Sequence, residues 1–322
     1  MDNKFKFFTS MIFSKKVFKV VFGKQKLVIP EPVNGIYVGS SDSFNISENY
    51  LKEWHDLFGS EGTDAVVPYT YYWPWLMDWL MKKLLPETGI NLKNVLHMGH
   101  AAEFSENFHE IVNGRFVVKN SLLDLCPLSR NKIDMVTQTI IESENGDVLF
   151  RVKDHTIVLN MSDEDMALLR NSEHWDHVDV PFRDDSFRKK ESMFAESNDC
   201  MRSVFKCNSD IASKFGSVSG ALSVTHATAL TAKFFRQGKV FLQGMCTGNI
   251  VMKVLCHELG EQVENFEVYF TNQLTFPQVV EIRYNQSRFE VFDEANTMVA
   301  YGSRKVHGAV SETVGFEERK VA

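Results

Sequence analysis

The 322-residue chain lacks several features that would assign it to a class at once. It has no run of about eighteen apolar residues, so we expect no transmembrane helix. Its five cysteines are odd in number and include no Cys-x-x-Cys pair, which disfavours a disulfide or zinc framework and indicates reduced thiols in the cytoplasm. With a formal net charge of −7, it also lacks the basic excess of a nucleic-acid-binding protein. We therefore expect a cytoplasmic protein with no nucleic-acid partner.

The chain is longer than a usual single domain of roughly 100–200 residues, so two domains or one double-size fold are expected. Residues 1–30 alternate lysine with phenylalanine and aliphatic residues, which is typical of a basic amphipathic segment. Such a segment either packs its phenylalanine face on the protein or makes weak contact with an anionic membrane surface. We favour packing.

The first half, residues 31–160, has a helix followed by strands. Tyr69 to Leu85 is strongly apolar and aromatic, contains an early proline and is followed by Pro86, which predicts a buried helix that ends there. A short strand is predicted over residues 36–38. Longer strands are predicted over 95–100, 102–104, 114–125, 132–143 and 148–159, and Asn145-Gly146 marks a hairpin between the last two.

The second half repeats this plan after a charged segment, residues 161–200, that we interpret as a linker. Within residues 201–322 we expect a helix over 227–235, an apolar run over 241–258, and strands over 263–270, 279–284, 287–293 and 297–305. Two successive helix-then-sheet units without βαβ alternation predict an α+β fold with two antiparallel sheets, each wrapped around a long central helix.

The segment with the strongest functional signal runs Ser219-Gly220-Ala221-Leu222-Ser223-Val224-Thr225-His226, with Ala232 and then Gln243-Gly244-Met245 behind it. A histidine titrates near neutral pH, and a glycine at a helix start lets backbone N–H groups approach a ligand oxygen. These are the parts of a proton-transfer site beside an oxyanion hole.

These residues and their spacing resemble the MaoC-like, or (R)-specific enoyl-thioester hydratase, family, whose motif reads Ser-Gly-Asp-x-Asn-Pro-Ile/Leu-His with a later Ala-His-Gly-Met. Ala221 stands where that family has its catalytic aspartate, and Ser223 stands where it has asparagine. Val224 replaces the motif proline and Gln243 the second histidine. The resemblance implies a double hotdog fold. It puts the activity in question, because Ala221 has no ionisable group.

The resemblance implies hydration of trans-2-enoyl thioesters, or dehydration of (R)-3-hydroxyacyl thioesters, in fatty-acyl or polyketide metabolism. The thioester partner would be acyl-CoA or an acyl carrier protein, and no cofactor or metal is implied. His226 would be the principal acid/base and Ser223 would orient water. The implied substrate-binding residues are Ser219, Gly220, Gly244 and Met245. The first half lacks the motif, so it would shape the acyl pocket without supplying chemistry, in a monomer or homodimer.

Several alternatives remain open. The chain could be a non-catalytic acyl-thioester-binding or scaffold subunit, a hotdog thioesterase with a carboxylate from elsewhere in the fold, or a protein in which His226 is only a hydrogen-bonded core residue. Cys246 could be a nucleophile, but a buried cysteine ordinarily behaves as a small hydrophobe. His97 and His100 have a metal-like spacing, but in a regular strand they would point to opposite faces.

Overall fold

A computed structural model describes most of the chain. The described residues are 26–30, 37–44, 48–58, 69–112, 115–128, 130–171, 192–194, 200–208, 210–219, 242–258, 262–274 and 278–307.

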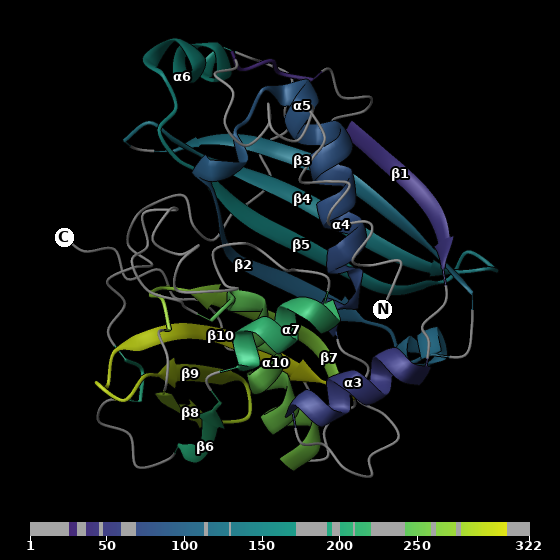
Figure 1. Ribbon diagram of the computed structural model, residues 1–322, viewed down its shortest axis with the longest axis vertical. Helices are drawn as coiled ribbons and strands as arrows, with labels where there is room; N and C mark the ends of the chain where they lie inside the picture. Colours follow the sequence, from purple (N-terminus) through teal and green to yellow (C-terminus); the bar gives the residue numbers. More distant parts are fainter. Residues whose placement is uncertain are drawn as a thin grey trace.

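All of the described strands belong to one antiparallel sheet (Figure 1). Its ten strands lie in the order β1-β3-β4-β5-β2-β7-β10-β9-β8-β6. The strands of the first half are β1 (Tyr37–Phe44), β2 (Val95–Phe104), β3 (Phe116–Leu128), β4 (Lys132–Ser143) and β5 (Val148–Val158). Those of the second half are β6 (Met201–Cys207), β7 (Val263–Phe270), β8 (Gln278–Tyr284), β9 (Arg288–Phe292) and β10 (Met298–Val306).

The two halves of the sheet are continuous. Strands β2 and β7 pair from Gly99↔Tyr269 to Glu103↔Asn265, so the sheets predicted for the two halves are joined edge to edge. The α+β class with antiparallel sheet and central helices is confirmed, whereas the helix expected over residues 227–235 lies outside the described residues.

The first central helix has a composite form. It begins with the 3₁₀ turn η1 (Tyr69–Tyr72), continues through α4 (Trp73–Trp79) and the π-helical turn η2 (Leu80–Leu84), and ends with α5 (Leu85–Thr88). The expected end at Pro86 is wrong by two residues. The helix ends where Gly89 adopts the left-handed conformation, φ 71°, in which glycine has no steric penalty. Pro86 directly follows the π-helical turn η2, so the helical hydrogen-bond pattern is already irregular where the proline has no N–H to donate.

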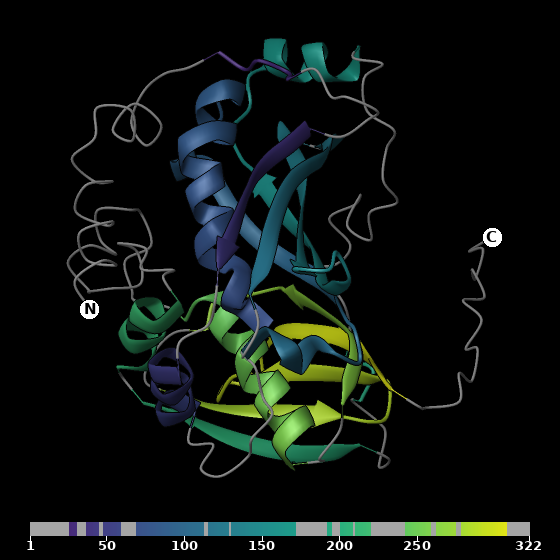
Figure 2. The same cartoon turned by 90° about the vertical axis from the view of Figure 1, so that its right-hand side faces the viewer.

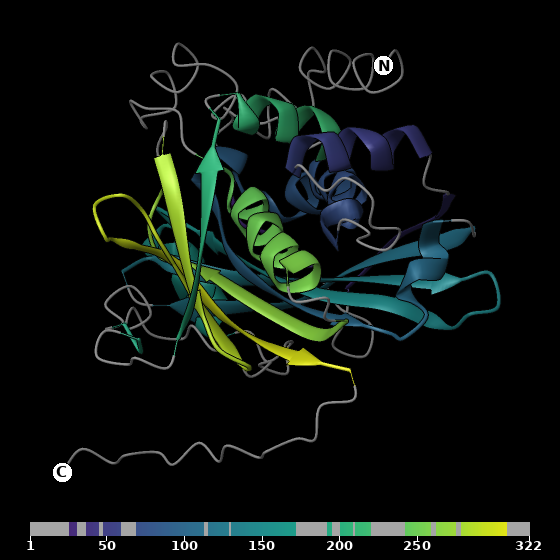
Figure 3. The same ribbon diagram turned by 90° about the horizontal axis from the view of Figure 1, so that it is seen from below.

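The second central helix occupies the apolar run over residues 241–258, to which the sequence analysis assigned no structure. It comprises α10 (Gly244–Lys253) and a π-helical turn, η6 (Val254–Glu258). Helices α4 and α10 lie on the same side of the sheet (Figure 2). The second half of the sheet curves around α10 (Figure 3). The main hydrophobic core fills the space between these helices and the sheet.

Three further α-helices and two short 3₁₀ turns are described, namely α3 (Glu48–Phe58), α6 (Asp163–Arg170), α7 (Ile211–Ser219), η3 (Leu92–Asn94) and η4 (Phe108–Val112). Helix α6 lies inside the segment predicted as a linker. The Ser162 hydroxyl caps it by accepting the N–H of Asp165, and Met166 and Leu169 are buried. None of the described helices is both long and apolar enough to span a bilayer.

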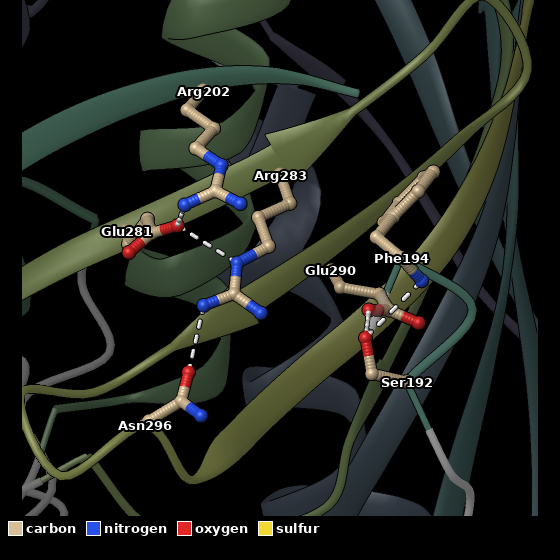
Figure 4. A network of polar contacts seen from close by, with 7 residues as sticks. All are labelled: Ser192, Phe194, Arg202, Glu281, Arg283, Glu290 and Asn296. Carbon is tan, nitrogen blue, oxygen red and sulfur yellow. Dashed lines mark hydrogen bonds and ion pairs between the residues drawn. The ribbon is translucent and has the colours of Figure 1, made fainter. Parts of the chain in front are cut away.

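The face of the sheet that is turned away from α4 and α10, here called the outer face, carries a second apolar cluster. Its buried members are Met98, Leu123, Val136, Ile157, Tyr269 and Tyr301. Beyond it, the buried Glu290 of β9 accepts the Ser192 hydroxyl at 2.6 Å (Figure 4). It also accepts the Met193 N–H at 2.7 Å. These bonds fix residues 192–194 to the sheet.

Candidate active site

Most of the predicted catalytic loop lies outside the described residues. Gly220, Ser223 and His226 all belong to that part of the chain. Ser219 is described, and it is the last residue of α7. Its buried hydroxyl donates to the Phe215 carbonyl oxygen one turn earlier, at 2.6 Å.

Gly244 and Met245 form the first turn of α10. Gln243 precedes them in an extended conformation, and its carbonyl oxygen accepts the N–H groups of Cys246 at 2.9 Å and Thr247 at 3.1 Å. The N–H groups of Gly244 and Met245 have no acceptor within the helix, and they sit at the positive end of its dipole. A Cβ at Gly244 would lie 2.6 Å from the Phe270 ring, so glycine is required for this close approach.

A bulge in β2 brings two histidines to the helix side of the sheet. His97 pairs with Thr156 of β5, but Gly99 pairs with His155 and His100 with Asp154, so Met98 is an extra residue. The Met98 side chain enters the outer cluster. His97 and His100 were expected on opposite faces only in a regular strand; here the inserted residue shifts the alternation by one, and both lie on the same face. Their ring centroids are 5.6 Å apart, with planes at 6°.

Asp154 of β5 connects His97 to the first central helix. Its Oδ1 lies 3.0 Å from His97 Nε2 and accepts the Tyr72 hydroxyl at 2.8 Å. The carboxylate is almost fully buried, whereas 15% of the His97 side chain is exposed. Because the carboxylate can only accept, His97 donates through Nε2 and keeps the Nδ1 lone pair for another proton.

The rings of Trp73 and Phe270 both pack against His97, with centroids 5.0 and 5.6 Å from the centroid of the imidazole. Phe270 is also the residue against which Gly244 packs. Phe270 therefore contacts both the histidine pair and the start of α10, although these come from different halves of the chain.

A second set of contacts fixes α10 against η1. The Asn249 amide donates to the Thr70 hydroxyl at 2.9 Å. The Tyr69 hydroxyl lies 2.9 Å from His100 Nε2 and faces Gly248, where any Cβ would overlap it. These contacts are buried, and through η1 they fix the position of His100 relative to α10.

Burial dominates the electrostatics of this region. It holds the pKa of His100 well below its ordinary value, and the neighbouring His97 and His155 lower it further. Burial, followed by the charge of Asp154, raises the pKa of Tyr69 and of Tyr72 well above the ordinary value. His100 is therefore neutral at neutral pH, and both tyrosines keep their protons.

Cys246 of α10 is fully buried, at 0% exposure. Burial raises its pKa well above the ordinary value, with a further contribution from Cys207. Because the thiolate is the nucleophilic form, this environment disfavours Cys246 as a nucleophile.

His97, His100 and Asp154 are the described residues whose geometry would admit a metal ion, since their ligand atoms lie within 4.8 Å of one another. Hydrogen bonds already engage Nε2 of both histidines and Oδ1 of Asp154. His100 Nδ1 and Asp154 Oδ2 are buried and make no hydrogen bond within the described chain. A cation would use these two atoms or displace a tyrosine hydroxyl, whereas proton transfer needs no rearrangement.

Two arginines on the outer face form a separate polar network (Figure 4). Glu281 accepts from Arg283 Nε at 2.7 Å and lies 3.5 Å from Arg202 Nη1. Arg283 also donates to Asn296 at 2.7 Å, and its guanidinium lies 3.9 Å from the Phe292 ring centroid. Glu281 contacts both guanidinium groups, and these contacts fasten β6 to β8 on the outer face.

The architecture described above defines a class, because two helix-and-sheet units that share one antiparallel sheet form a double hotdog fold. MaoC-like dehydratases have this fold. No protein-family model matches the sequence, and a search of curated proteins finds no match.

Among solved structures, the chain is similar over 83% of its length to the peroxisomal multifunctional enzyme type 2 from Drosophila melanogaster, at 14% identity and a TM-score of 0.59. It spans 48% of that enzyme. A MaoC-like dehydratase from Phytophthora capsici matches 85% of this chain and 96% of its own, at 12% identity and a TM-score of 0.61. A double hotdog protein from Mycobacterium tuberculosis matches 83% and 95%, at 9% identity and 0.53. At these identities the likeness is one of fold.

Proposed function

We propose that the chain acts on acyl thioesters, hydrating a trans-2-enoyl thioester or dehydrating the corresponding (R)-3-hydroxyacyl thioester. The observation that carries this proposal is the start of α10. Two first-turn N–H groups, of Gly244 and Met245, lie at the positive helix end beside Phe270 of the adjoining β7, in a double hotdog. Donors so placed stabilise the negative charge that develops on a thioester oxygen.

In this proposal His226 is the principal acid/base and Ser223 orients water, as the resemblance of their loop implies. Ser219 and Gly220 contribute to substrate binding. The thioester is carried by CoA or by an acyl carrier protein, in fatty-acyl or polyketide metabolism in the cytoplasm. Residues 31–160 and 201–322 act as the two hotdog units of a monomer or homodimer.

The test is hydration of short and long trans-2-enoyl-CoA, followed by loss of the conjugated-thioester absorbance. We expect turnover by the wild type and a fall of about 10²–10⁴-fold in His226→Ala, the usual contribution of an acid–base group. Ala221→Asp restores the family's aspartate and should raise the rate. His109→Ala, which changes an exposed histidine outside the site, is the matched control.

A second candidate function is thioester binding without catalysis, which is favoured by Ala221 at the motif's aspartate position. It predicts saturable binding of enoyl-CoA by the wild type, measured by calorimetry, with no turnover on any chain length. Absence of both turnover and binding would contradict the two proposals together.

A further inference from the structure

We infer that His97 is a second catalytic acid/base and that Asp154 positions it, so that the first half of the chain supplies the proton-transfer group which Ala221 cannot. This inference rests on the proposed function. It departs from the expectation that the first half only shapes a pocket.

The geometry of the pair is that of an oriented general base. Asp154 Oδ1 lies 3.0 Å from His97 Nε2, which fixes the ring and its tautomer. The Tyr72 hydroxyl holds the same oxygen at 2.8 Å, and Asp154 is buried to 1% exposure. Once His97 takes up a proton, the adjacent carboxylate stabilises the imidazolium.

A second histidine–aspartate pair has a similar distance between its partners but a different exposure. His155 and Asp134 lie 3.1 Å apart, and their side chains are 4% and 0% exposed. In the alternation of β5, His155 is on the outer face, whereas Asp154 faces the central helices. That pair is sealed, whereas the His97 side chain, at 15% exposure, remains partly accessible.

The position of His97 also matches the proposed thioester site. Phe270 packs against both Gly244 and the His97 ring, so the histidine lies one aromatic ring away from the oxyanion donors. Among the described residues, the titratable groups packed around it are Tyr69 and Tyr72 of η1, His100 of β2 and Asp154 of β5. Both tyrosines and His100 are neutral there.

The reaction balances without a cofactor. In hydration, His97 Nδ1 removes one proton from water as the water oxygen bonds to C3 of the enoyl group. The C2=C3 electron pair moves toward the thioester carbonyl, whose oxygen is held by the Gly244 and Met245 N–H groups. C2 then takes up one proton from solvent and His97 releases its proton to solvent, so the net change is addition of one water.

The experiment compares wild type, His97→Ala, Asp154→Asn and the control His109→Ala with trans-2-enoyl-CoA. We expect His97→Ala to lower kcat about 10²–10⁴-fold with little change in KM, because it removes a group used mainly in the transition state. Added imidazole should restore part of the kcat of His97→Ala, and Asp154→Asn should lower kcat more than tenfold. The rescue by imidazole does not follow from a purely structural role. Circular dichroism and Tm confirm that each variant is folded.

A compensating variant sharpens the test. Ala221→Asp should recover part of the activity of His97→Ala, because the aspartate supplies the missing group, but it should not rescue His226→Ala. Full activity in folded His97→Ala would overturn the inference and leave the proposed function standing. Stoichiometric zinc in the wild type that is lost in His97→Ala would also overturn it, because His97 would then be a metal ligand.

If the wild type has no turnover, the proposed function and the catalytic role of His97 are both overturned. Turnover by the wild type together with full activity in folded His97→Ala overturns the inference alone.

Discussion

At the scale of single residues, His100 should make the stability of the protein depend on pH. Its pKa is held well below the ordinary 6.5 by burial. Above that pH, both folded and unfolded states are neutral. As the pH falls below 6.5, only the unfolded chain gains the proton, so the free energy of unfolding decreases by up to about 1.4 kcal/mol per pH unit.

The measurement is urea unfolding between pH 7.5 and 5 for wild type and His100→Gln. Glutamine does not titrate, so the variant should lose less stability across this range, whatever its stability at pH 7.5. The exposed His109→Gln should follow the wild type. Parallel curves for wild type and His100→Gln would contradict the assignment of a buried neutral imidazole.

At the scale of elements, the contact between α10 and η1 depends on Gly248. A Cβ there would overlap the Tyr69 hydroxyl and lie 3.3 Å from Cζ of the same ring. Gly248→Ala should therefore displace Tyr69, break its contact with His100 and destabilise the fold by about 1–3 kcal/mol, as overpacking of a core does.

Tyr69→Phe removes the overlapping oxygen, so the double variant Gly248→Ala/Tyr69→Phe should be more stable than the sum of the single changes predicts. Thermal or urea unfolding of the four proteins gives the coupling energy. Additive effects would show that the two positions are not in contact.

The strands were largely predictable from sequence. The predicted strands over residues 132–143 and 263–270 coincide with β4 and β7, because long β-branched and aromatic runs bounded by turns leave few alternatives. β6 and most of β1 were missed. Both are edge strands, and β1 is rich in serine, so neither carries a clear apolar alternation.

At the scale of the whole molecule, we expect the two halves to unfold together. β2 and β7 form a continuous set of backbone pairs. The Phe58 ring of α3 packs on the Phe215 ring of α7, with ring centroids 6.2 Å apart. Three of the five tryptophans, at positions 73, 75 and 79, lie in α4 and report on the first half. Urea unfolding followed by tryptophan fluorescence should therefore coincide with that followed by far-UV circular dichroism. Two separated transitions would show that the halves are independent.

The candidate site was predictable only in part, because it is assembled from both halves. The glycine at the start of α10 was found because Gly244-Met245 is a local pattern. His97 and Asp154 are 57 positions apart, and no local pattern joins them. Their meeting depends on strand register and on a bulge, and single-sequence periodicity cannot reveal either.

The extra residue at Met98 sets the spacing at which this pair of histidines can be recognised in a sequence. His97 lies opposite Thr156 and Gly99 lies opposite His155, so deleting Met98 would give a regular strand in which the two histidines, now two positions apart, still share the helix side. The outer cluster would lose one apolar side chain, and the contact between His97 and Asp154 would be kept. A homologous sequence without the insertion should therefore carry the same pair as His-x-His.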